Sequence, residues 1–209
     1  MSLAPADLPK EPKCVPPIPV PTYGAGGVFT VACAAELAAP ALQCLEKVLD
    51  LPHYGSWNTF IPRAEVLTSG PDDNASAPLP PEVQALAARP GFVSPGARIR
   101  FDAVMSGSWT RSVELDVSFL EAFDPADGGG KAYRVAWKGT SFPTFLLRSE
   151  RVQEFVEYVA EDGSVRTKYA NWETFGGLLG YVLPREQIVA GFEKWTVGLK
   201  KAVEEEVAK

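Results

Sequence analysis

Three polar side chains near the C-terminal end have the types and spacing needed for acid–base chemistry. Asp162-Gly163 separates two strand-like segments, and this dipeptide is typical of a two-residue hairpin turn. Such a turn pairs Glu154 with Asn171 and puts both on the same face as Glu173. A carboxylate in an apolar cavity has a raised pKa and can serve as a general acid or base. We therefore expect Glu154, Asn171 and Glu173 to be catalytic if this face points inward.

The orientation of the hairpin decides whether these polar side chains face the cavity, where they could be catalytic, or face the solvent. The opposite face carries the charged residues Arg151 and Lys168 and is expected to meet water. The alternative is that Glu154 lies at the strand edge in solvent. A β-bulge would exchange the two faces of the hairpin.

His53 and Arg111 are two further candidates for a catalytic role. His53 is the single histidine, so it could act as a general base at neutral pH or could cap a helix end. One histidine cannot form a multi-histidine metal site, and the three widely spaced cysteines form no zinc pattern, so we expect no metal and no cofactor. Arg111 continues the apolar parity of the strand that follows it. It could hold a carboxylate or an enolate, or lie at the wet end of that strand.

Aromatic and apolar side chains recur in the segments that would face a gap between sheet and helix. At any one position a place in the core is the simpler interpretation. Together, so many aromatic rings favour a planar or polycyclic ligand. The candidate ligand contacts are Tyr54, Trp57, Phe60, Phe101, Met105, Trp109, Tyr133, Trp137, Tyr169, Phe175, Phe192 and Trp195.

The order of the predicted elements indicates the fold class. Alternation of polar and apolar residues predicts strands, and a stripe at three-to-four spacing predicts a helix of about 24 residues that begins at Pro184. Strands followed by a terminal helix indicate an α+β fold, in which a curved antiparallel sheet of about seven strands surrounds the long C-terminal helix and leaves an internal cavity. The expected strands are 28–33, 63–68, 98–103, 113–119, 133–138, 149–159 and 165–175, and a first helix follows Pro40.

Two segments depart from this pattern. Residues 1–22 contain seven prolines, which is typical of an extended, mobile arm, or of an arm that covers a cavity or binds a partner. Residues 69–97 interrupt the strands as an insertion, either a lid over the cavity mouth or a surface loop. We therefore expect a proline-rich arm over 1–22 and one domain over 23–209.

Composition narrows the class of partner. The chain has 209 residues, a net charge of −6 and a pI near 5.0, which argues against binding to nucleic acid. No apolar run approaches the roughly 20 residues of a membrane span, so no membrane insertion is expected. The N-terminus lacks a signal-peptide pattern and the cysteines form no disulfide framework, so a cytoplasmic protein is expected. The sequence leaves the oligomeric state open.

Two short motifs, together with the order of elements, resemble a known superfamily. They are the segment YGSWNTFIP at residues 54–62 and the strand end WETFGG at residues 172–177, just before the last helix. In these features the chain resembles the START-like (SRPBCC) superfamily of polyketide cyclases and dehydrases, lipid-transport proteins and pollen allergens. The resemblance implies a helix-grip fold whose deep cavity binds lipids, sterols, hormones or polyketides.

The resemblance also implies a function. Some members of the superfamily catalyse cyclisation or dehydration of their ligand without a shared catalytic triad. We therefore expect a partner that is a small hydrophobic molecule, and a cofactor-independent cyclase, dehydratase or isomerase of polyketide or terpenoid metabolism. The alternative is a non-catalytic carrier or sensor of a lipid or hormone-like ligand.

Overall fold

The computed structural model describes residues 1–70, 79–106, 109–125 and 130–207. Among these residues, eight strands form one antiparallel sheet in the order β1-β2-β8-β7-β6-β5-β4-β3. The strands are β1 (Lys13–Val15), β2 (Phe29–Leu37), β3 (Arg63–Thr68), β4 (Arg98–Ser106), β5 (Trp109–Ala122), β6 (Ala132–Gly139), β7 (Arg148–Val159) and β8 (Val165–Gly176). The helices are α1 (Ala41–Leu49), α2 (Pro81–Ala87) and α3 (Arg185–Val207), with short 3₁₀ turns η1 (Leu51–Ser56) and η3 (Leu178–Tyr181).

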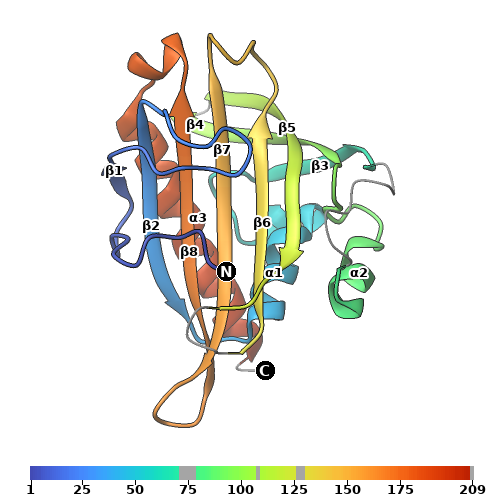
Figure 1. Cartoon of the computed structure of the whole chain (residues 1–209). Helices are drawn as coiled ribbons and strands as arrows, with labels where there is room; N and C mark the ends of the chain where they lie inside the picture. The colour runs from blue at the N-terminus through green and yellow to red at the C-terminus, as the bar shows by residue number, and fades with distance from the viewer. Residues whose placement is uncertain (71–78, 107–108, 126–129, 208–209) are drawn as a thin grey trace.

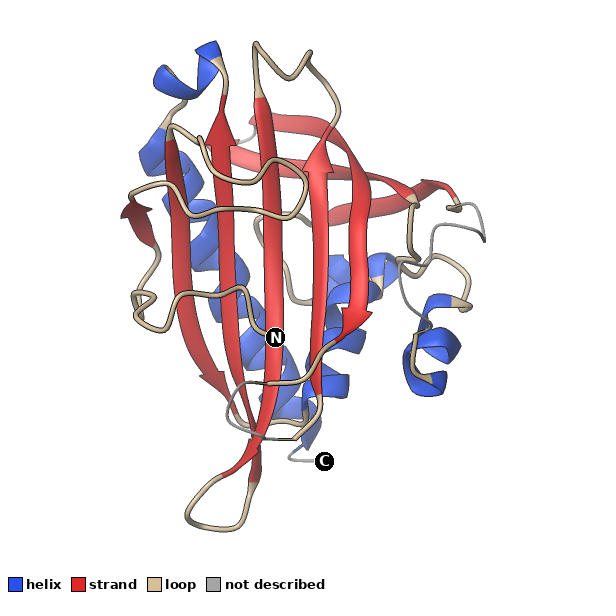
Figure 2. Cartoon of the chain, in the orientation of Figure 1, coloured by secondary structure: helices blue, strands red, loops and turns tan. Residues whose placement is uncertain are grey.

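The sheet is curved, and each of its faces is covered by a different part of the chain. Figure 1 shows α1 and α3 behind the sheet and the N-terminal segment in front of it. We call the side that faces α1 and α3 the inner face and the other side the outer face. The view by secondary structure shows the long helix crossing the strands on the inner side (Figure 2). The predicted α+β architecture with a long C-terminal helix is confirmed, and the strand beyond the expected seven is β1.

Helix α3 packs against the sheet through one apolar stripe. Phe192, Trp195, Leu199 and Val203 are buried, at the three-to-four spacing that keeps them on one face of a helix. Gly198 lets the helix approach η1 closely, because a Cβ atom at this position would lie 2.4 Å from the carbonyl oxygen of Trp57. The close approach brings the stripe against the aromatic segment that follows α1.

The hairpin between β7 and β8 differs from the predicted register by one residue. Gly163 donates its N–H to the Ala160 carbonyl oxygen and has φ +80°, whereas every non-glycine residue described has negative φ. A two-residue type I′ turn needs positive φ at both central residues, so Asp162 excludes it. The loop is instead a type I turn followed by a left-handed glycine. Gln153 therefore lies opposite Asn171, and Glu154 opposite Ala170.

A shift of one residue exchanges the faces of β7. Arg151, predicted to meet water, lies on the inner face opposite Glu173. Glu154, predicted to lie beside Asn171, lies on the outer face. The residues of β8 keep the predicted side, so Asn171 and Glu173 point inward. The prediction for Arg151 and Glu154 was wrong because it rested on the type I′ turn.

The proline-rich segment lies against the outer face and forms β1 at the sheet edge. Its Val20 is buried with Trp172 and Val152, side chains that the sheet directs outward. Its backbone also donates hydrogen bonds to two buried carboxylates, from Leu3 to Glu154 at 2.8 Å and from Thr22 to Glu150 at 2.7 Å. The expectation of a mobile arm was therefore wrong, because the outer face offers both an apolar surface and hydrogen-bond acceptors.

The described part of the insertion packs beside the first helix. Val83 and Leu86 of α2 are buried in the main core, as are Val93 and Ala97. Residues 71–78 of the insertion lie outside the described residues. Within 79–97 no residue lines the cavity described below, so this part of the insertion does not cover the cavity mouth.

Candidate ligand-binding cavity

A cavity of about 180 Å³ lies between the inner face and the first half of α3. Strands β4 to β8 form one wall, and the start of α3 forms the other. The loop between β6 and β7 borders it through Ser141 and Phe142, and Leu183-Pro184 border it just before α3. Its walls are mainly apolar. The predicted ligand contacts that line it are Phe60, Phe101, Met105, Trp137, Phe175 and Phe192.

The other predicted aromatic contacts do not line this cavity. Trp109 is 56% exposed, because it is the first residue of β5 and does not lie over α3. The rest are buried in the packed core. The Tyr54 hydroxyl, for example, donates to the Val48 carbonyl oxygen at 2.6 Å, whereas Trp57 Nε1 has no hydrogen-bond partner among the described residues. These core residues are Tyr54, Trp57, Tyr133, Tyr169 and Trp195.

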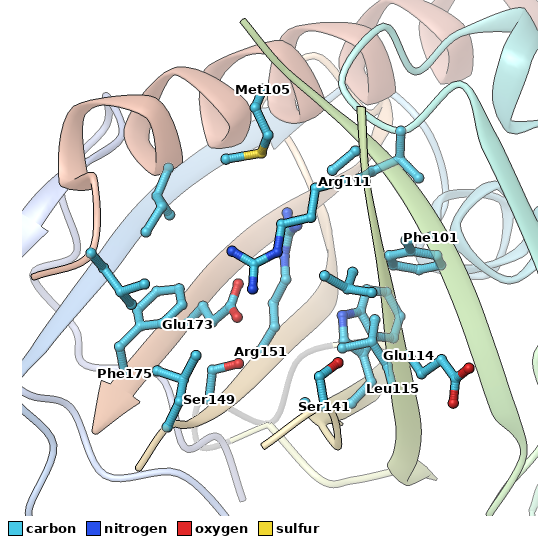
Figure 3. Close-up of a pocket in the computed structure, with 18 of the residues that line it drawn as sticks. Phe101, Met105, Arg111, Glu114, Leu115, Ser141, Ser149, Arg151, Glu173 and Phe175 are labelled. Atoms are coloured by element: carbon cyan, nitrogen blue, oxygen red, sulfur yellow. The ribbon is translucent and has the colours of Figure 1, made fainter. Parts of the chain in front are cut away.

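Four polar side chains of the sheet reach the apolar cavity from the inner face. Arg111 comes from β5, Ser149 and Arg151 from β7, and Glu173 from β8. Figure 3 shows the Arg111 guanidinium extending into the cavity towards Glu173 and Arg151. Antiparallel pairing of β7 with β8 places Arg151 directly opposite Glu173. Arg111 and Glu173 are thus the two predicted catalytic residues that the fold brings to the cavity.

Glu173 is held in conditions that favour its protonated form. Burial raises the pKa of its carboxyl above the ordinary value, and the positive charge of Arg151 and a hydrogen bond from Ser149 offset only part of that increase. A carboxyl with a raised pKa exchanges protons more readily near neutral pH. Glu173 therefore has the properties expected of an acid–base group.

Arg151 is the residue of this site that the sequence did not reveal. It is only 4% exposed, and its Nε donates to Asn171 Oδ1 at 2.9 Å. Its guanidinium stacks on two rings of α3, 4.1 Å from the centroid of Trp195 and 4.3 Å from that of Phe192. Its Nη2 has no hydrogen-bond partner among the described residues. The signal that could have found it was the correct turn type at Gly163.

A hydrogen-bonded group lies beside Arg151, deeper between sheet and helix. Tyr169 donates its hydroxyl proton to Gln153 Oε1 at 2.5 Å and accepts a hydrogen bond from Trp195 Nε1 at 3.1 Å. Asn171 is fully buried and receives the bond from Arg151. Neither Tyr169 nor Asn171 lines the cavity. Asn171 is therefore placed to orient Arg151 rather than to touch a ligand.

Glu154 and His53 lie away from the cavity, contrary to their prediction as catalytic residues. Glu154 is buried on the outer face, where it pairs with Arg134 Nη2 at 2.6 Å. His53 is exposed in η1, and its Nδ1 lies 2.8 Å from Asp50 Oδ1. The histidine follows the first helix as expected, but its ring points to solvent and meets the acidic residue at the helix end.

Comparison with known proteins identifies the fold. No protein-family model and no curated protein sequence matches the chain. A hypothetical protein from Helicobacter pylori has a similar structure, with a TM-score of 0.54 at 14% identity, over 83% of this chain and 87% of that chain. A START superfamily protein from Mycobacterium smegmatis has a TM-score of 0.52 at 19% identity, over 84% of this chain and 97% of that chain. The Zhui aromatase/cyclase from Streptomyces sp. R1128 has a TM-score of 0.49 at 18% identity, over 85% and 92%.

The similarity to the START superfamily protein, with its TM-score of 0.52, confirms the predicted START-like fold. The chain has a helix-grip architecture, in which a curved antiparallel sheet surrounds a long C-terminal helix. At this level of sequence identity the fold is shared, while ligand and activity must be argued from the cavity itself. Among the described residues, no helix is long and apolar enough to cross a membrane.

Proposed function

We propose that the protein binds a small hydrophobic molecule in this cavity and transforms it without a cofactor, with Glu173 as the acid–base residue. The observation that supports this most is a carboxyl of raised pKa inside an apolar-walled cavity. Cyclisation, dehydration and isomerisation all require a proton to be moved at a defined place on the ligand. One positioned carboxyl can contribute about 10²- to 10⁴-fold to such a step.

The volume of the cavity indicates how large the enclosed part of the ligand can be. An apolar cavity of about 150 Å³ can hold one benzene molecule, and the cavity here measures about 180 Å³. The space favours a ligand of about one ring over the polycyclic ligand that the number of aromatic residues suggested. A polyketide or terpenoid ligand would therefore be a small member of its class.

A non-catalytic carrier is the second candidate function. It is favoured because Glu154, Asn171 and His53 do not line the cavity, which leaves fewer polar groups for chemistry than the sequence suggested. A carrier needs only one or two polar groups that orient its ligand. The two functions differ in whether the ligand is converted, and in whether conversion depends on Glu173.

Binding in the cavity can be tested before the natural ligand is known. Native mass spectrometry of freshly purified protein would detect a co-purified ligand, and ligand-observed NMR would measure binding of p-xylene, a neutral one-ring hydrocarbon. Ala103 lines the cavity and is 6% exposed, so Ala103→Phe would fill the space with a ring. Ala122→Phe, at an exposed position of β5, is the matched control. We expect p-xylene to bind the wild type and Ala122→Phe but not Ala103→Phe. Equal binding to both variants, or no binding to the wild type, would refute a ligand cavity at this place.

Catalysis is tested with the molecule that co-purifies. We expect Glu173→Gln to reduce its conversion by at least 100-fold and to leave its binding within a few-fold. Glu114→Gln is the control, because Glu114 is exposed at the cavity rim and its carboxylate points away from Arg111 (Figure 3). No conversion by the wild type, with binding intact, would favour the carrier. Equal conversion by wild type and Glu173→Gln would exclude Glu173 as the acid–base residue.

A further inference from the structure

The cavity contains more positive charge than its surroundings balance. Arg111 and Arg151 both line it. Of the two carboxyl residues at its surface, Glu114 is exposed and points away from Arg111 in Figure 3, so Glu173 is the one that faces the arginines. Two guanidinium groups thus meet one carboxyl, and burial favours the neutral form of that carboxyl.

Neither arginine is paired with this carboxyl. An ion pair requires a basic nitrogen within about 4.0 Å of a carboxylate oxygen. Among the described residues, no Lys, Arg or His nitrogen lies this close to a Glu173 oxygen. The Arg111 guanidinium has no hydrogen-bond partner there, and Arg151 leaves Nη2 without one. Arginine stays charged in proteins, so it cannot reduce the cost of burial by losing its proton. A buried guanidinium N–H without an acceptor, such as that of Arg151 Nη2, is unfavourable, and Arg111 is half-buried.

Contacts inside the protein stabilise part of the Arg151 side chain, but they do not stabilise the guanidinium of Arg111. The rings of Phe192 and Trp195 stabilise the face of the Arg151 guanidinium, and Asn171 accepts the bond from Nε. No aromatic ring holds Arg111 in this way among the described residues. Its side chain is half-buried and extends into the cavity rather than along the wet end of β5 (Figure 3). Arg111 therefore directs its donor groups into the cavity without a partner among the described residues.

We infer that the ligand is a small hydrophobic acid, with one anionic oxygen group held by Arg111 and Arg151 and an apolar body against Phe101, Met105 and Phe175. A guanidinium matches a carboxylate through two parallel N–H···O bonds. The unpaired donors of the two arginines supply such bonds from β5 and β7, the strands on either side of β6. The apolar walls and the volume of about 180 Å³ then favour an enclosed apolar body of about one ring. This ligand class requires the proposed function, because it describes what occupies the same cavity.

The test compares two probes of the same shape that differ in charge. The full chain is titrated at pH 7.5 with 4-ethylbenzoate and with 4-ethylbenzamide, and the dissociation constants are measured by calorimetry. We expect the acid to bind at least tenfold more tightly than the amide. Arg111→Gln should weaken binding of the acid by at least tenfold and leave binding of the amide within twofold. Arg63→Gln, which removes an arginine whose side chain is 73% exposed on β3, should change neither.

The melting temperature of the unliganded protein separates binding from a structural role. Because Arg111 has no partner to lose, Arg111→Gln should leave this temperature unchanged or raise it. A lower melting temperature with the preference for the acid retained would mean that Arg111 is structural, and would overturn the inference. Equal affinity for acid and amide, or binding of p-xylene without binding of the acid, would also overturn it while leaving the proposed function intact. Failure of all three probes would overturn both.

Discussion

Glu154 is predicted to stabilise the fold by holding the N-terminal segment to the outer face, not to act on a ligand. It is 1% exposed, and its Oε1 accepts bonds from Arg134 Nε at 2.8 Å, Arg134 Nη2 at 2.6 Å and the Leu3 N–H at 2.8 Å. The Ser2 hydroxyl donates to Oε2 at 2.5 Å. Glu154→Ala would leave the Arg134 side chain, itself 5% exposed, without its main partner. Removing one member of a buried pair typically destabilises a protein by about 3–5 kcal/mol.

The free energy of unfolding, measured by urea denaturation with tryptophan fluorescence, tests this expectation. Glu121→Ala is the matched control, because Glu121 pairs with the same arginine but its side chain is 27% exposed, so the expected loss is about 1 kcal/mol or less. Replacing Arg134 and Glu154 together by methionine should recover much of the loss, since an apolar pair avoids the buried charge.

The same variant reports on the N-terminal segment. Releasing Ser2 and Leu3 should make the segment easier to digest, so trypsin should cut after Lys10 faster in Glu154→Ala than in wild type. Binding of p-xylene should not change. A loss of stability no larger than that of Glu121→Ala would refute the role of the buried pair. A loss of p-xylene binding without unfolding would indicate that Glu154 contributes to the ligand-binding cavity after all.

Two further predictions concern the cavity and helix α3. The pKa of Glu173 is raised on folding, so its contribution to stability is present below the unfolded value of about 4.3 and is lost as the pH rises through the folded value. Glu173→Gln, which does not titrate, should therefore raise the melting temperature relative to wild type more at pH 8 than at pH 4; an equal difference at both pH values would contradict the raised pKa. Gly198→Ala places a Cβ 2.4 Å from the Trp57 carbonyl oxygen. The resulting strain of about 1–3 kcal/mol should exceed the roughly 1 kcal/mol that alanine adds to a helix, so urea denaturation should show lower stability, whereas a gain would refute the close approach.

The sequence was sufficient to predict the helices and strands that bury only one of their faces. In α3 the apolar residues Phe192, Trp195 and Leu199 follow the helical period because only that stripe meets the sheet. Strands β4 and β5 alternate for the same reason. Together these patterns determine an antiparallel sheet with a terminal helix, and the structure confirms both.

The inner face of β7 could not be identified in this way, because both faces of β7 are buried. Arg151 and Gln153 are buried under α3, and Val152 and Glu154 are buried under the N-terminal segment. With no wet face, the pattern of polar and apolar residues carries no information on orientation. The prediction then depended on the turn, where an Asp-Gly pair fits both a two-residue loop and the end of a three-residue loop.

The sequence also could not show which aromatic residues line the cavity and which belong to the packed core. Phe101 lines the cavity, whereas Tyr54, which packs against it with 5.7 Å between ring centroids, does not. Both side chains are in an apolar environment, so hydrophobicity cannot distinguish them. Only the path of the backbone decides which ring has a neighbour on every side and which faces an opening.

The short strand β1 also protects the protein from self-association. It pairs with Thr30–Ala32 near the start of β2, and the Ala34 N–H donates to the Pro9 carbonyl oxygen, so much of the β2 edge is already occupied. The new edge is only three residues long and is flanked by Pro12 and Pro16, which have no N–H to offer a neighbouring chain. A shortened chain that lacks this segment would expose nine mostly apolar residues as an open edge. The proline-rich segment therefore also acts as a built-in barrier to edge-to-edge aggregation.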